Sequence, residues 1–114
     1  MTEKEKRLLL IDLSARLPYK PHVRIQDRDA DLDIDAVLNG TYLHDWITLP
    51  SCQNMVITPY LRPMSSMTKE ELSLRSKGFK SGYEYYDWLN ANHFDYRGLI
   101  PMGLALEAKN GMYE

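Results

Sequence analysis

The chain has 114 residues, of which 44% are hydrophobic and 26% are charged, and its formal net charge is -2. These values are typical of a folded domain and exclude a disordered or low-complexity segment. A chain of this length buries roughly two-thirds of its unfolded surface, so we predict a single domain over residues 1–114. A slightly negative net charge does not favour binding to the negatively charged backbone of a nucleic acid, so nucleic acid is not an expected partner.

The first residues predict an N-terminal helix. Thr2 and Glu5 have the spacing of a capping box, in which a hydroxyl and a carboxylate satisfy each other's backbone N–H groups. Leucines follow at the three- and four-residue spacings of one apolar stripe, and Pro18 cannot continue a helix. We therefore predict a helix over residues 3–16.

The opening segment also bears on localisation. Its charged TEKEKR is followed only by the short apolar run LLLI, which is neither a signal sequence nor a membrane span. We expect a cytoplasmic protein with no membrane partner. Cys52 is the single cysteine, so no disulfide within the chain and no CxxC pair is possible. We interpret it as a small packed or partly exposed side chain.

The middle of the chain predicts a β-hairpin. Residues 31–38 and 41–49 both alternate in polarity, and Asn39-Gly40 between them is the dipeptide that best suits a type I′ turn. In this register one face of the hairpin is apolar. The other face is polar and aromatic, and it carries Asp33, Asp35, Tyr42, His44 and Trp46.

The remaining segments predict further strands and two C-terminal helices. Capping-box spacings recur at Thr68 with Glu71 and at Ser81 with Glu84. Pro59 is expected to end a strand, and residues 99–108 are compatible with a helix, a strand or both. The expected strands cover residues 22–26 and 55–58, with a loop at 50–54, and the expected helices cover residues 68–77 and 82–92. Together the elements predict an α+β fold, with a small antiparallel sheet and C-terminal helices packed on its apolar face.

No pattern in the sequence predicts catalysis, a metal site or a cofactor. The alternating aspartates from Asp27 to Asp35 superficially resemble a calcium loop, but counting from Asp27 places Leu32 and Leu38 where that loop needs Gly and Glu. An acidic strand that discourages edge pairing is the preferred interpretation. No paired-histidine motif, phosphate-binding loop or nucleophile elbow is present, so we predict a protein that is not an enzyme.

Aromatic residues gather between positions 83 and 96. Trp88 and Phe94 are predicted to be core residues. The tyrosines fit a core or an interface equally well. The working hypothesis is a protein–protein interaction module, with self-association as one form of that interaction. Its predicted contact residues are Tyr83, Tyr86, Tyr96 and Arg97. The alternative is a protein that binds or sequesters a small ligand or nucleotide on the polar-aromatic hairpin face.

Three segments carry a resemblance to a known group of proteins. They are LLLIDLSARLPY, PYLRPMSSMTKEE and HFDYRGLIPMGLALEAKNGMY. They resemble short uncharacterised proteins of Bacteroidales-type gut bacteria and their phages, over most of the chain except its middle sheet. The resemblance implies no activity. A phage or mobile-element setting favours a small protein that acts by binding a host component.

Overall fold

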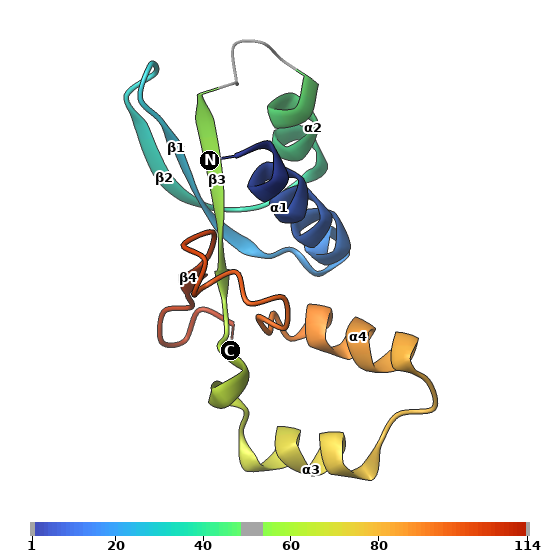
Figure 1. The fold of residues 1–114 in the computed structure, drawn as a ribbon. Coiled ribbons are helices and arrows are strands. Elements are labelled where there is room, and N and C mark those ends of the chain that lie inside the picture. Colours follow the sequence, from blue (N-terminus) through green and yellow to red (C-terminus); the bar gives the residue numbers. More distant parts are fainter. Residues whose placement is uncertain (1, 49–53, 114) are drawn as a thin grey trace.

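The computed structural model describes residues 2–48 and 54–113, and it confirms an α+β fold with an N-terminal helix, a sheet and C-terminal helices (Figure 1). The helices are α1 (Glu3–Arg16), α2 (Gly40–Thr48), α3 (Lys69–Lys77) and α4 (Gly82–Ala91), with single 3-10 turns at Leu17–Tyr19 and Met64–Ser66. The strands are β1 (His22–Asp27), β2 (Leu32–Val37), β3 (Met55–Leu61) and β4 (Leu106–Glu107). Cys52, and all but the last residue of the loop predicted at 50–54, lie outside the described residues.

The predicted helix caps are confirmed. Before α1, the Thr2 N–H donates to Glu5 Oε1 at 2.9 Å and the Glu5 N–H donates to Thr2 Oγ1 at 3.0 Å. Thr68 and Glu71 form the same reciprocal pair before α3. Ser81 accepts the Glu84 N–H at the start of α4. Short polar side chains at these positions satisfy backbone donors that a helix leaves free, which explains why the starts of these helices are readable from the sequence.

The sheet is mixed, with the strand order β2-β1-β3-β4. β1 runs antiparallel to both of its neighbours, whereas β4 runs parallel to β3. The hairpin in this sheet joins β1 to β2, where the Asp27 carboxylate accepts the Asp29 N–H and Asp31 adopts a φ of 49°. Aspartate tolerates this left-handed conformation better than most residues. The prediction of a hairpin at Asn39-Gly40 was therefore wrong.

The residues after Asn39 form α2 instead of a strand. The Asn39 side chain accepts the Tyr42 N–H at 2.9 Å, which is the bond of a helix cap. Leu43 and Trp46 are three residues apart, and both are buried, so the segment satisfies a helical spacing as well as an alternating one. Asn-Gly suits both a type I′ turn and a helix start, and here the helix buries the indole ring, whose N–H donates to the Met55 carbonyl at 2.7 Å.

β3 also runs further than expected, because Pro59 does not end it. The antiparallel pairing with β1 stops at Val23 opposite Pro59, and the parallel pairing with β4 begins one residue later, at Tyr60. Proline cannot donate a backbone hydrogen bond, so it is tolerated where β3 changes its pairing partner.

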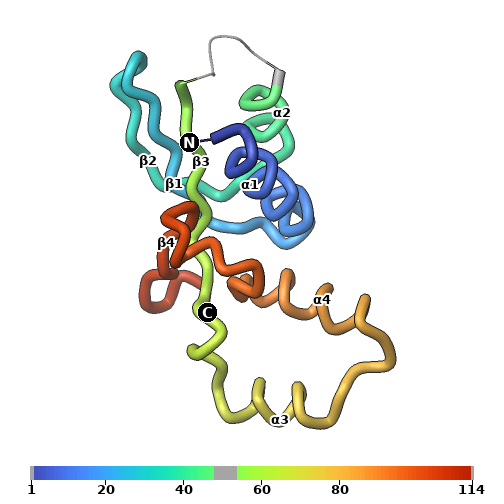
Figure 2. The backbone as a smooth tube through the Cα atoms, viewed as in Figure 1, coloured from blue at the N-terminus to red at the C-terminus, as the bar shows by residue number. Residues whose placement is uncertain are grey.

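The chain buries its apolar side chains in two clusters. α1 and α2 lie together beside the sheet and form the main core with it (Figure 1). The C-terminal helices do not cover the sheet as predicted: Figure 2 shows the chain leaving β3 and carrying α3 and α4 away from it. A second cluster forms there, around Met67, Leu89 and Phe94. We call residues 64–91 the helical arm.

The correction at Asn39-Gly40 can be tested by Gly40→Ala. A type I′ turn needs a left-handed residue there, and alanine would destabilise it by about 1 kcal/mol. In α2 a Cβ at Gly40 meets nothing within 4 Å, so we expect unchanged stability or a gain of about 0.5 kcal/mol in urea unfolding. Gly98→Ala is the control, because Gly98 has a φ of 75° and its replacement should destabilise the fold. A loss at Gly40 equal to that at Gly98 would contradict the helix.

Candidate functional site

The outer surface of α4 presents tyrosine side chains. Tyr83 is 83% exposed and Tyr86 is 52% exposed, and at a spacing of three residues they are neighbours on the helix surface. The ring of Tyr96, which follows the helix, lies 5.2 Å from that of Tyr86 and is half-buried. We call Tyr83, Tyr86 and Tyr96 the tyrosine patch. Two of the three predicted contact tyrosines are thus strongly exposed.

A layer of further aromatic rings supports this patch. Phe94 is fully buried, as predicted, and Trp88 is half-buried with its ring 5.6 Å from that of Phe94. Tyr85 lies between, with its ring 5.6 Å from Tyr86 and 6.4 Å from Trp88. Sequence reasoning missed Phe79, whose ring lies 5.3 Å from that of Tyr85. Aromatic pairs at such distances stabilise one another beyond simple area burial, so the exposed rings rest on a continuous aromatic base.

Polar contacts hold the end of the patch in place. The Tyr96 hydroxyl donates to Asn90 Oδ1 at 3.0 Å, and the Arg97 guanidinium lies 4.5 Å from the centre of the Tyr96 ring. Arg97 also donates from Nη1 to Asp12 Oδ1 at 2.7 Å. The predicted contact residue Arg97 therefore already has an ionic partner within the chain. Its role in the patch is to fix the Tyr96 ring.

The ionic partner belongs to a buried network that links α1 to the segment after α4. Asp12 and Arg16 are both fully buried, and Arg16 Nε donates to Asp12 Oδ2 at 2.9 Å. Arg16 Nη2 donates to the Phe94 carbonyl at 2.5 Å. Sequence reasoning missed this pair. The signal is an acid and a base four residues apart within the leucine stripe of α1, a spacing that places both on one helix face.

The C-terminal segment is anchored beside this network by Tyr113. Its hydroxyl accepts the His22 N–H at 2.8 Å and donates to the Tyr60 carbonyl at 2.7 Å. Its ring stacks on the buried ring of His93, with the centroids 3.7 Å apart. Burial lowers the pKa of His93 to about 4, and the nearby charges of Arg16, His22 and Arg62 act in the same direction. His93 is thus a neutral core residue at pH 7.

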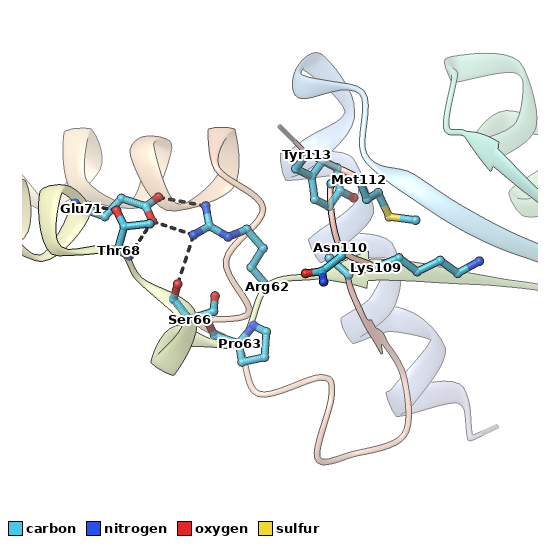
Figure 3. Close-up of a pocket in the computed structure, with 11 residues that line it drawn as sticks. Arg62, Pro63, Ser66, Thr68, Glu71, Lys109, Asn110, Met112 and Tyr113 are labelled. Atoms are coloured by element: carbon cyan, nitrogen blue, oxygen red, sulfur yellow. Dashed lines mark hydrogen bonds and ion pairs between the residues drawn. The ribbon is translucent and has the colours of Figure 1, made fainter.

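A pocket of about 410 Å³ lies between the start of the helical arm and the C-terminal segment (Figure 3). Most of its charged and hydroxyl groups already have partners: Arg62 forms two hydrogen bonds with the Glu71 carboxylate, which also accepts the Thr68 N–H, and the Thr68 hydroxyl accepts the Glu71 N–H. Ser66 donates to the Pro63 carbonyl. A polar ligand would have to break these bonds to enter, so the pocket is a poor candidate for a binding site.

The polar-aromatic hairpin face does not exist, because its residues belong to two different elements. Asp33 and Asp35 lie on β2, whereas Tyr42, His44 and Trp46 lie on α2. Trp46 is a buried core residue. Asp33 forms an ion pair with Arg24, and Asp35 accepts from Lys109 and from the Tyr60 hydroxyl. These partners hold the pKa of both carboxyls below their usual range.

The described residues offer little else for ligand chemistry. Residues 2–48 and 54–113 contain no group of histidine, cysteine or acidic side chains that could hold a metal ion. No described helix has the length and apolar character needed to cross a membrane. No known protein family, curated protein or solved structure matches the chain. The tyrosine patch is therefore the best-supported candidate site.

Removal of the Asp12 carboxylate should destabilise the whole fold. Asp12→Ala leaves the Arg16 guanidinium buried without its counter-charge, and we expect a loss of about 3–5 kcal/mol in urea unfolding. The double variant Asp12→Ala/Arg16→Met removes both charges and should recover most of that loss. A loss below about 1 kcal/mol in the single variant, or no recovery in the double variant, would contradict the role of the network.

Acidification should weaken the fold through His93. Its pKa is about 4 in the folded chain and 6.5 in the unfolded chain, so the unfolded state binds more protons between these values. Stability from this group is complete above pH 6.5 and falls as the pH drops to 4, by on the order of 2 kcal/mol after allowance for solvent screening.

The measurement is urea unfolding at several pH values between 4 and 7. His93→Asn is the matched variant, since asparagine tolerates the φ of 63° at this position and does not titrate. Its stability should vary less with pH than that of the wild type. Identical pH profiles for the two proteins would show that His93 is not a buried neutral group.

Proposed function

We propose that this chain is a small non-enzymatic protein-binding module whose contact surface is the tyrosine patch. The observation that carries the proposal is the exposure of Tyr83 and Tyr86 on a helix whose other side is packed. A tyrosine ring supplies a large apolar area and a hydroxyl for hydrogen bonding, and tyrosine is enriched among the residues that dominate binding energies.

The support beneath the patch favours tight binding. Tyr96 is fixed by Asn90 and Arg97, and Tyr86 rests on the rings of Tyr85 and Tyr96. Side chains that are ordered before binding lose little conformational entropy when the partner arrives. An aromatic side chain that is already ordered therefore contributes more binding free energy than the same residue on a mobile loop.

The shape of the patch favours a protein over a small molecule. Small ligands are usually bound in concave pockets that enclose most of their surface. Tyr83 projects into solvent, and the 410 Å³ pocket lies elsewhere and is lined by groups that bind one another. The resemblance to proteins of Bacteroidales-type bacteria and their phages leads us to propose a host protein as one class of partner.

The proposal can be tested by capture from a lysate of the cells in which the protein occurs. Tagged wild type should retain a specific protein, and Tyr83→Ala/Tyr86→Ala should lose it. Each substitution should cost about 2 kcal/mol of binding free energy, or roughly a thirtyfold loss of affinity for the retained protein.

The matched control is Tyr42→Ala, which removes a partly exposed tyrosine from α2 and leaves the patch intact. It should bind like the wild type. Thermal unfolding of each variant establishes that the fold is retained. Equal retention of the captured protein by wild type and the double variant would contradict the proposal.

A further inference from the structure

The helical arm leaves large apolar side chains exposed to solvent. α3 has no buried residue, and its Leu72 and Leu74 are 47% and 49% exposed. These leucines are two positions apart, so they point about 200° apart around the helix axis and cannot both face α4 of the same chain. A helix of nine residues is marginally stable by itself in water. The arm is thus incompletely covered in the isolated chain.

The overall shape agrees with this view. The molecule measures 48 × 28 × 24 Å, and its radius of gyration is 14.9 Å. A compact chain of this length has a radius of gyration of about 13 Å. Figures 1 and 2 show the source of the difference, since α3 lies at the end of the molecule that is farthest from α1, α2 and the hairpin.

Charge on the arm changes sign after the first turn of α3, where Lys69 lies beside Glu70 and where Glu71 is paired with Arg62. Residues 72–80 contain Arg75, Lys77 and Lys80 and no acidic residue. Residues 81–96 contain no lysine or arginine, and their exposed acids are Glu84 and Asp87. None of the ion pairs found in residues 2–48 and 54–113 joins the two segments. The arm therefore carries a basic and an acidic surface that are complementary in sign.

We infer that the arm binds the arm of a second copy of this chain in a twofold symmetric dimer. A twofold axis brings the basic segment of each copy against the acidic segment of the other, so the same attraction occurs twice. The contact covers one of the two exposed leucines of α3 together with Tyr83 and Tyr86. This inference rests on the proposed function and names its partner: a self-complementary surface fits a second copy better than a partner with a single sign of charge.

The test is a charge exchange followed by light scattering after size exclusion and by analytical ultracentrifugation. One variant makes the basic segment acidic, through Arg75→Glu/Lys77→Glu/Lys80→Glu. The other makes the acidic segment basic, through Glu84→Lys/Asp87→Lys. The wild type should have twice the chain mass of 13.3 kDa. Each variant alone places like charges together and should dimerise at least about tenfold more weakly.

Mixing the two variants should restore a dimer, because the reversed segment of each now faces an opposite charge in the other. Restoration also shows that both variants are folded. Two controls separate other causes: Lys4→Glu/Arg7→Glu reverses exposed charges on α1, and Tyr19→Phe removes the hydrogen bond that Asp87 accepts from Tyr19 without changing any charge. Both controls should dimerise like the wild type.

The outcomes separate this inference from the proposed function. A wild type that stays monomeric at every concentration, or a dimer that neither charge variant weakens, overturns the dimer. If that monomer still retains a lysate protein through Tyr83 and Tyr86, the protein-binding function stands without self-association. If the mixture of variants stays monomeric while each alone is folded, the proposed pairing of segments is wrong.

Discussion

The buried pair of Asp12 and Arg16 is the constraint on which the rest of the structure depends. Two buried charges are tolerated where they pair with each other and with further polar groups, and beyond the Arg16–Asp12 bond itself these further groups come from distant parts of the chain. Arg16 donates a hydrogen bond to the carbonyl of Phe94, and Asp12 accepts one from Arg97. The first helix is thereby tied to the segment that follows α4, which fixes where the helical arm leaves the main core.

The candidate binding surface follows from this attachment. Phe94 fills the second apolar cluster, and Arg97 lies over the ring of Tyr96, so the network fixes both the base and one end of the tyrosine patch. α4 gains its support from this side, whereas α3 buries none of its residues. We therefore expect α4 to contribute most of the binding free energy, and α3 to be stabilised most when a partner covers the arm.

The sequence predicted the local features and missed those that depend on distant contacts. Capping residues act within one helical turn, so Thr2, Thr68 and Ser81 located the starts of three helices. The segment after Asn39 fits two periodicities, and only the burial of Trp46 against β3 selects the helix. The partners of Asp12 lie 85 positions away in one case, and no local pattern indicates such a contact. The exposure of Tyr83 depends in the same way on where α4 packs.

The central claim is that the network holds α4 as an ordered platform before any partner binds. Amide hydrogen exchange on the isolated chain tests this claim most directly, because it reports the opening of each helix separately. We predict that the amides of α4 and of Phe94, whose N–H donates to the Leu89 carbonyl at 3.0 Å, exchange as slowly as those of β1 and β3. Rapid exchange throughout α4, with β1 and β3 still protected, would show that the platform forms only on binding and would contradict the account.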